Sequence, residues 1–149
     1  MALIEIPDIN NFRVFGDREY RGGQPKTPVA WTWLKEQARV TRVIKLNEDS
    51  EGSDADGKAL GLEIVYLPIN LADQIIFHPN YDDVVKAVDL IVPGTLVHCG
   101  RGQDRSGLIV GCYRVWKQGW KKEDAYAEML LHGFHPELLG LMLFWEWAV

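Results

Sequence analysis

Three side chains that could do chemistry together lie within one short stretch of the chain. Cys99 is followed, after five residues, by Arg105 and then Ser106, and two of the intervening residues are Gly100 and Gly102. A free thiol has a pKa of about 8.5, so only a small fraction is thiolate at neutral pH. Inward-pointing N–H groups in a glycine-rich loop, a helix N-terminus and a planar arginine fork all favour a thiolate and a bound phosphate. The spacing therefore predicts a sulfur nucleophile held against a phosphate group.

The elements around this stretch must hold it in place. After the Pro93-Gly94 turn, residues 95–98 read as a strand, and residues 105–116 read as a helix whose first turn would face the loop. The Ser106 hydroxyl could donate a hydrogen bond to sulfur and help it leave in a second step. The alternative is a buried cysteine at an ordinary strand-to-helix junction. That alternative explains neither the glycines nor the Arg-Ser pair.

The run His98-Cys99, five residues, then Arg105-Ser106-Gly107 resembles the signature of the cysteine-dependent tyrosine and dual-specificity phosphatases. The resemblance implies that Cys99 is the nucleophile, that Arg105 clamps the phosphate and that Ser106 assists breakdown of a phosphocysteine. It also implies that His98 holds the cysteine backbone and tunes the thiol. The main-chain N–H groups expected to cradle the phosphate belong to Gly100, Arg101, Gly102, Gln103, Asp104 and Arg105.

A weaker resemblance extends from about residue 12 to residue 136. The Tyr-Arg-Gly-Gly-Gln-Pro run at residues 20–25 is similar to the Tyr-Arg-Ser-Gly-Gln-Pro opening of bacterial and atypical dual-specificity phosphatases, with Gly22 in place of the usual serine. A hydroxyl contact near the site is therefore expected to be missing. Arg21 is expected either to support the catalytic loop or to form an ordinary structural ion pair.

The reaction also needs an acid that protonates the leaving group and then activates water. Family members carry an aspartate in the loop before the nucleophile strand, and Asp73 occupies that loop here. Asp82 and Asp83 are rivals, but they are expected on the solvent face of a helix. Asp104, inside the catalytic loop, is a third rival. The resemblance requires no metal and no cofactor.

Substrate identity stays open at this point. Phosphotyrosine and dual-specificity protein substrates are the main expectation, with small phosphomonoesters also possible. Some inositol and lipid phosphatases have a lysine where this chain has Gln103, which weakens the case for a polyanionic substrate, and Arg101 partly restores the lost charge. Phosphoinositide or inositol-phosphate hydrolysis, a catalytically weak phosphate-binding module, and sulfurtransferase or arsenate-reductase chemistry remain as alternatives.

Length, charge and cysteine content limit the number of domains and the kinds of partner. The 149 residues are expected to form one domain, 1–149, and a net charge of −5 argues against a broad nucleic-acid-binding surface. Two cysteines suggest no disulfide framework, and no segment reads as a signal peptide or a membrane span. A cytoplasmic monomer is therefore expected.

Apolar periodicity and turn residues predict an α/β fold with a mostly parallel sheet of four to five strands flanked by helices, as the family resemblance also implies. The predicted strands are 12–15, 19–21, 41–46, 63–67 and 95–98, and the predicted helices are 27–37, 54–60, 79–91, 105–116, 121–132 and 137–147. In open α/β sheets, ligands bind at the carboxyl ends of the strands, where residues 99–105 would lie.

The remaining candidates have mostly structural interpretations. The acidic run 47–56 is expected to be a solvated loop rather than a metal site, because its spacing does not fit a calcium loop. Cys112 is expected in the core, with a redox role as the alternative. His78 could line the pocket mouth, whereas His132 and His135 are expected to be surface or turn residues.

Overall fold

A five-stranded sheet forms the centre of the molecule. The computed structural model describes residues 8–70 and 78–149. The strand order is β1-β2-β5-β3-β4; β1 is antiparallel to β2 and every other neighbouring pair is parallel. The strands are β1 Arg13–Val14, β2 Tyr20–Gly22, β3 Arg42–Lys45, β4 Glu63–Tyr66 and β5 Thr95–His98. The predicted mostly parallel α/β sheet is confirmed.

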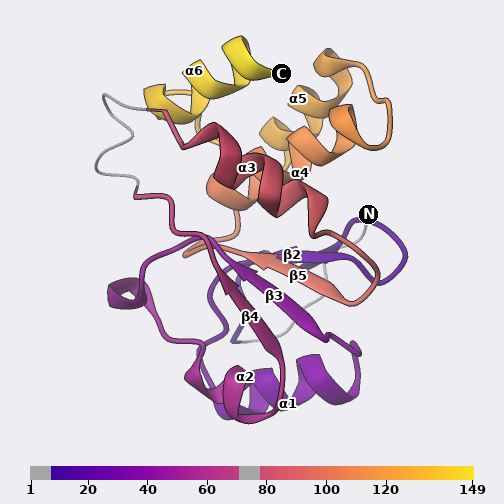
Figure 1. Ribbon diagram of the computed structural model, residues 1–149, viewed down its shortest axis with the longest axis vertical. Helices are drawn as coiled ribbons and strands as arrows, with labels where there is room; N and C mark the ends of the chain where they lie inside the picture. The colour runs from indigo at the N-terminus through magenta and orange to yellow at the C-terminus, as the bar shows by residue number, and fades with distance from the viewer. Residues whose placement is uncertain (1–7, 71–77) are drawn as a thin grey trace.

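Helices cover both faces of the sheet. On one face lie α1 and α2, and on the other lie α3 to α6, with α4 between the sheet and the outer helices (Figure 1). The helices are α1 Pro28–Glu36, α2 Ala55–Ala59, α3 Tyr81–Asp89, α4 Arg105–Trp116, α5 Lys122–Leu131 and α6 Leu139–Ala148, and a 3-10 turn, η1, spans Asp49–Glu51. Each predicted helix is present, within a few residues of its expected ends.

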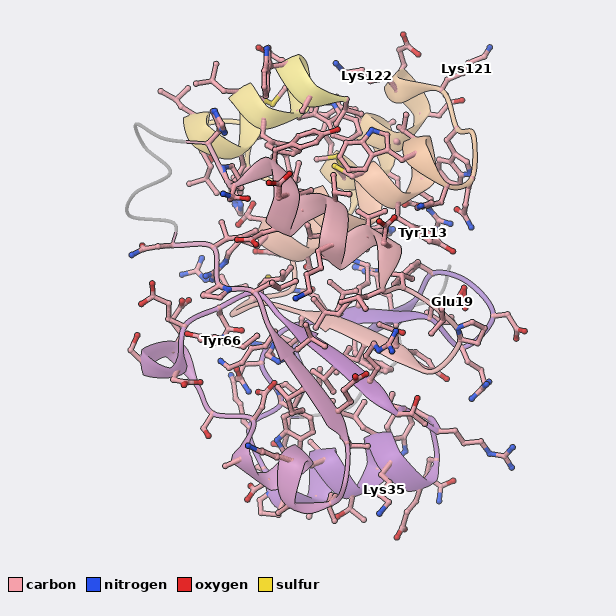
Figure 2. The ribbon with its side chains drawn as sticks, viewed as in Figure 1. Glu19, Lys35, Tyr66, Tyr113, Lys121 and Lys122 are labelled. Carbon is pink, nitrogen blue, oxygen red and sulfur yellow. The ribbon has the colours of Figure 1, made fainter. Side chains whose placement is uncertain are left out.

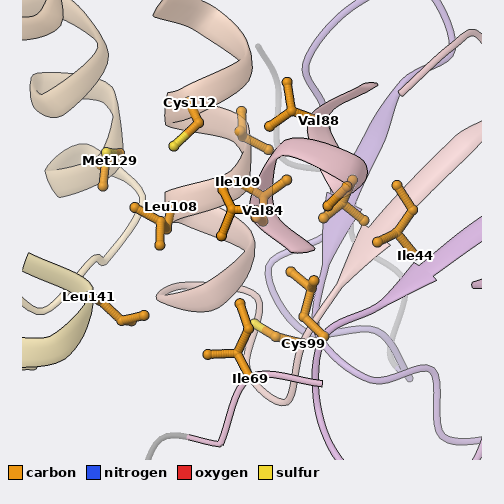
Figure 3. Packing of buried hydrophobic residues seen from close by; sticks show 14 of the residues in the cluster. Ile44, Ile69, Val84, Val88, Cys99, Leu108, Ile109, Cys112, Met129 and Leu141 are labelled. Carbon is orange, nitrogen blue, oxygen red and sulfur yellow. The ribbon is translucent and has the colours of Figure 1, made fainter. Parts of the chain in front are cut away.

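Alternation along the central strands divides the core into two layers, because successive side chains of a strand point to opposite faces. Val43 and Leu96 pack on the α1 side with Trp31. Ile44 and Val97 pack on the other side, against α3 and α4. Figure 3 shows this second layer, in which Cys99 lies at the end nearest the strands.

Local signals explain where several helices begin. The Thr27 hydroxyl accepts a hydrogen bond from the Ala30 N–H at 3.2 Å, and proline occupies the first helical position of α1, as predicted. At α3 the cap is the Asn80 side chain. Tyr81, at the start of α3, is 45% exposed, and its ring lies beside that of Trp116.

One aromatic side chain of the sheet is exposed to solvent: Tyr66, at the end of edge strand β4, is 45% exposed. In Figure 2 it lies on the side of the view opposite Glu19 and Tyr113. In the described parts of the chain, no helix is long and apolar enough to cross a membrane.

The parallel arrangement brings four loops to one edge of the sheet. Strands β2, β5, β3 and β4 all end there, so the segments that follow them in the sequence become neighbours in space. These segments are residues 23–25, 99–104, 46–54 and 67–70. The catalytic loop predicted from the sequence therefore lies at the carboxyl ends of the strands.

Candidate active site

Cys99 begins a tight loop between β5 and α4. Its side chain is buried, and its sulfur accepts a hydrogen bond from the Gly102 N–H at 3.3 Å. The distance from Cys99 Sγ to Ser106 Oγ is 3.4 Å, with the thiol as donor. A thiolate would reverse that bond and accept from the hydroxyl instead. The sulfur thus lies within hydrogen-bonding distance of the Gly102 N–H and the Ser106 hydroxyl.

Arg105 lies at the start of α4 and is 4% exposed. Its Nη1 and Nη2 atoms donate to the two carboxylate oxygens of Glu51 at 3.0 and 2.7 Å, and Nη1 also donates to the Ile69 carbonyl. Its Nε is buried and has no hydrogen-bond partner in the described parts of the chain. Glu51 and Ile69 therefore fix the orientation of the guanidinium through its two Nη atoms.

Glu51 and Arg105 also tune each other. The hydrogen bonds from Arg105 lower the pKa of Glu51, against the opposing effect of burial. Burial lowers the pKa of Arg105, but the Glu51 carboxylate and the nearby Cys99 outweigh it and raise that pKa above its ordinary value. Both side chains stay charged at neutral pH. The acidic run was expected to be only solvated, and this pair corrects that expectation.

A second residue of the same run supports the nucleophile strand. Asp54 Oδ2 lies 2.7 Å from His98 Nε2, and Asp54 Oδ1 accepts from Gln24 Nε2 at 2.7 Å. Gln24 Oε1 in turn accepts from Asn47 Nδ2 at 2.8 Å. His98 is fully buried, with Nδ1 3.3 Å from the Cys99 carbonyl. These hydrogen bonds fix the imidazole beside Cys99.

Lys45 explains why the acidic run folds over the site. Its buried ammonium donates to three carbonyl oxygens, those of Asn47, Glu48 and Gly52. The loop therefore closes around a cation at the end of β3, which holds Glu51 and Asp54 in place. No group of three or more His, Cys, Asp or Glu side chains in the described parts of the chain is arranged to hold a metal ion.

Asp104 binds the connection between α5 and α6. Its Oδ1 accepts from both the backbone N–H and the Nδ1 of His135, at 2.7 and 2.9 Å. An aspartate held by two donors is a poor candidate for the acid. His135 was expected to be a plain surface or turn residue; it contacts the catalytic loop and lines the cavity.

Of the other three acid candidates, only Asp82 and Asp83 fall among the described residues. Asp73 falls in residues 71–77, outside the described residues. Asp82 and Asp83 are exposed in the first turn of α3, as expected. Neither contributes to the cavity beside Cys99.

A cavity of about 450 Å³ opens above the thiol. Described residues that line it are Glu51, Cys99, Gly100, Arg101, Asp104, Arg105, His135, Glu137 and Leu138. The Gln103 side chain is not among these residues. It packs against Gly133, because a Cβ added to Gly133 would lie 2.6 Å from the Nε2 atom of Gln103. The loop thus offers the cavity a thiol, backbone N–H groups and two arginines.

The remaining candidates lie away from the thiol. Cys112 is fully buried farther along α4, near Met129, and burial raises the pKa of its thiol (Figure 3). His78 stacks on Trp147 with ring centroids 5.6 Å apart, and it is not among the described residues lining the cavity. His132 lies in the turn after α5, as the expectation of a surface or turn position allowed, but it is only 8% exposed.

Comparison with solved structures identifies the architecture. The chain superposes on the Siw14 catalytic core with a TM-score of 0.80 and 19% identity, covering 97% of this chain and 88% of that one. The fold is that of the cysteine-dependent phosphatases. Pseudomonas aeruginosa TpbA gives a TM-score of 0.74 with 21% identity, over 97% of this chain and 88% of that one. PTPMT1, solved in complex with PI(5)P, gives 0.70 with 20% identity, over 91% and 94%.

Sequence comparison with this phosphatase group is local. The dual specificity protein phosphatase TpbA of Pseudomonas aeruginosa is 45% identical over 42 residues, which are 28% of this chain and 19% of that protein. The match thus spans about a fifth of the length of this curated relative. No protein-family model matches the chain.

Proposed function

We propose that the protein is a phosphomonoester hydrolase that works through a phosphocysteine intermediate. The observation that carries this proposal is the combined placement of Cys99 and Arg105: the sulfur accepts from a loop N–H, and both residues line the same cavity. The shared phosphatase fold supports the same reaction class. A buried, reactive thiol in a nest of donors is suited to attack on a dianion.

The reaction proceeds in two steps. The Cys99 thiolate attacks phosphorus in line, and the S–P bond forms as the bond to the leaving oxygen breaks. Arg105 and the loop N–H groups stabilise the charge on the transferring phosphoryl group. Water then attacks phosphorus, inorganic phosphate departs, and the Ser106 hydroxyl stabilises the released thiolate.

The direct test is hydrolysis of an aryl phosphate in the presence of a chelator. Wild type should turn over, and Cys99→Ser should lose turnover while it keeps its fold and still binds phosphate. Wild-type activity in Cys99→Ser would contradict the mechanism. A thiosulfate–cyanide assay tests the sulfurtransferase alternative; cyanide-dependent thiocyanate production exceeding phosphate release would favour it.

Asp73 is proposed as the acid that protonates the leaving group and as the base that activates water. Asp73→Asn should lower kcat by roughly 10²–10⁴-fold, the usual contribution of such a group. Asp82→Asn is the matched control, because Asp82 is an exposed aspartate on α3, and its kcat should stay within twofold of wild type. A loss of tenfold or less in Asp73→Asn would remove Asp73 from the mechanism.

The charges around the cavity support protein phosphotyrosine or dual-specificity substrates over polyanions. Among the described residues, three carboxylates line the cavity, those of Glu51, Asp104 and Glu137, against the two cations Arg101 and Arg105. Arg105 is also paired with Glu51. A substrate with several phosphates would meet a net negative rim, whereas a single phosphate on a basic peptide would not. Phosphoinositide or inositol-phosphate hydrolysis is the alternative, since PTPMT1 was solved with PI(5)P.

A comparison of substrates distinguishes a protein phosphatase from an inositol or lipid phosphatase. A phosphotyrosine peptide flanked by lysines should give a kcat/KM about tenfold above the same peptide flanked by glutamates, and the gap should shrink with salt. Glu137→Gln should reduce the difference in kcat/KM between the two peptides. Glu123→Gln, at an exposed glutamate on α5, should leave that difference unchanged. Preference for an inositol polyphosphate over both peptides would establish the alternative.

A further inference from the structure

Three consecutive carbonyl groups of the catalytic loop are each held by a donor from one distant segment. The Gly100 carbonyl accepts from the Gln24 N–H at 3.1 Å, and the Arg101 carbonyl accepts from Asn11 Nδ2 at 2.9 Å. The Gly102 carbonyl accepts from Arg21 Nη2 at 3.4 Å. All three donors belong to residues 11–24, here called the bracing segment.

The planarity of the peptide bond gives these contacts a consequence. In a trans peptide, the C=O of one residue and the N–H of the next point in opposite directions. Holding the carbonyls of residues 100, 101 and 102 toward the bracing segment therefore turns the N–H groups of residues 101, 102 and 103 the other way. One of these three, the Gly102 N–H, is seen to donate to Cys99 Sγ. These are N–H groups that a bound phosphate requires.

Close backbone packing adds to this arrangement. Gly102 has a φ of 78°, and an added Cβ would lie 2.5 Å from the backbone of Gly22 and of Gly23. The Cys99 N–H also donates to the Gly22 carbonyl at 3.2 Å. The catalytic loop thus rests directly on the end of β2, with no space for a side chain between them.

Arg21 is an unusual residue to find in this position. It is fully buried, and its Nε and Nη1 have no hydrogen-bond partner in the described parts of the chain. Burial lowers its pKa to about 10, opposed by the nearby Cys99 and Glu128, so the guanidinium remains charged at neutral pH. Burying an arginine without a bonded carboxylate is costly. A structural ion pair, the sequence-based alternative, is not found for Arg21 among the described residues.

We propose that Asn11 and Arg21 are positioning residues, which orient the peptide planes of residues 100–103 so that their N–H groups face the phosphate. This inference rests on the proposed function, because it assigns the orienting groups of that same site. Arg21 acts from beneath the loop through the Gly102 carbonyl. Asn11 acts from the side through the Arg101 carbonyl.

Orthovanadate binding is the test, because it measures the anion nest without requiring turnover. Asn11→Asp replaces the amide donor by an acceptor of the same shape, and Asn10→Asp adds the same charge at an exposed neighbouring residue. The dissociation constant for orthovanadate should rise about tenfold in Asn11→Asp, the effect of one lost hydrogen bond, and less than twofold in Asn10→Asp. Equal dissociation constants in these two variants would overturn the assignment of Asn11.

Arg21 is tested by rescue. Arg21→Met keeps a long apolar chain but removes the donors, and it should weaken orthovanadate binding at least tenfold in protein whose circular dichroism matches wild type. Arg21→Lys restores one charged donor and should recover part of the loss, which a purely space-filling role would not predict. Unchanged binding in Arg21→Met would overturn the assignment of Arg21.

Different results would contradict the proposed function and the positioning roles of Asn11 and Arg21. Wild type that binds orthovanadate but hydrolyses no phosphomonoester would contradict the proposed function and leave the positioning roles measurable by binding. Wild type that turns over, with Asn11→Asp and Arg21→Met equal to it in kcat, KM and orthovanadate affinity, would contradict the positioning roles alone.

Discussion

At the scale of single residues, the site depends on how Arg105 is held. Glu51 engages Nη1 and Nη2 together, a bidentate geometry that fixes the plane of the guanidinium. The guanidinium is then fixed before phosphate binds, so less conformational entropy is lost on binding. Glu51 therefore acts through Arg105.

Glu51→Gln should lower kcat/KM about tenfold, because the amide keeps one acceptor oxygen and turns its NH₂ toward a cationic donor. Steady-state kinetics on an aryl phosphate measures the effect. Asp56→Asn, an exposed aspartate just beyond the loop, is the matched control and should leave kcat/KM within twofold of wild type. Higher activity in Glu51→Gln would mean that Glu51 competes with phosphate for Arg105.

The two thiols should differ in reactivity. Burial raises the pKa of Cys112 and keeps it protonated, whereas Cys99 lines the open cavity and accepts a hydrogen bond from the Gly102 N–H. Iodoacetamide at neutral pH should modify Cys99 in the folded protein and leave Cys112 unmodified, as peptide mapping by mass spectrometry would show. Preferential labelling of Cys112 would contradict the assignment of the nucleophile.

Residue chemistry was predictable from sequence only where it is local. Cys99, Arg105 and Ser106 are neighbours along the chain, so spacing alone indicated their association. Glu51 and Asp54 are separated from them by about fifty positions, and their roles follow from strand pairing. The available signal was an acidic run directly after a parallel core strand, which places carboxylates at the same sheet edge as the loop.

At the scale of elements, the loop after β3 supports the nucleophile strand. Lys45 holds the loop closed through three carbonyls, and Asp54 reaches from it to His98. Helix and strand positions were predictable because apolar periodicity and caps such as Thr27 are local signals. The contacts of this loop were not, because a solvated acidic loop and an ordered one have the same composition.

Asp54→Ala should destabilise the fold by about 1–3 kcal/mol, the cost of leaving a buried polar partner unsatisfied. It should also lower kcat, because His98 and Gln24 both lose the carboxylate that orients them. Urea denaturation and kinetics measure the two effects. Asp56→Ala removes an exposed carboxylate of the same loop region. It should change the free energy of unfolding by less than about 0.5 kcal/mol, as surface substitutions usually do.

At the scale of the whole molecule, the sheet topology assembles the site from segments that are distant in sequence. Because β2, β3 and β5 are parallel, residues 23–25, 46–54 and 99–104, which follow these strands, meet at one edge. Behind that edge lies a buried group of basic side chains. There, burial, together with Arg13 and Arg21, lowers the pKa of His132 to about 4.

Acid should therefore destabilise the fold through His132. Its pKa is lower in the folded than in the unfolded chain, so the unfolded chain binds the extra proton between about pH 6.5 and 4. The stabilisation is complete above about pH 6.5 and is lost as the pH falls toward 4. His132→Gln should show a shallower fall in melting temperature across this window. Parallel curves for the two proteins would show that other groups determine the acid sensitivity.

The most direct test of the central claim is to look for the phosphoryl group on sulfur. Wild type mixed with excess radiolabelled aryl phosphate and rapidly denatured should carry label on the peptide that contains Cys99, and Cys99→Ser should carry none. Phosphate release by wild type with no labelled cysteine peptide, together with equal release by Cys99→Ser, would contradict the phosphocysteine mechanism.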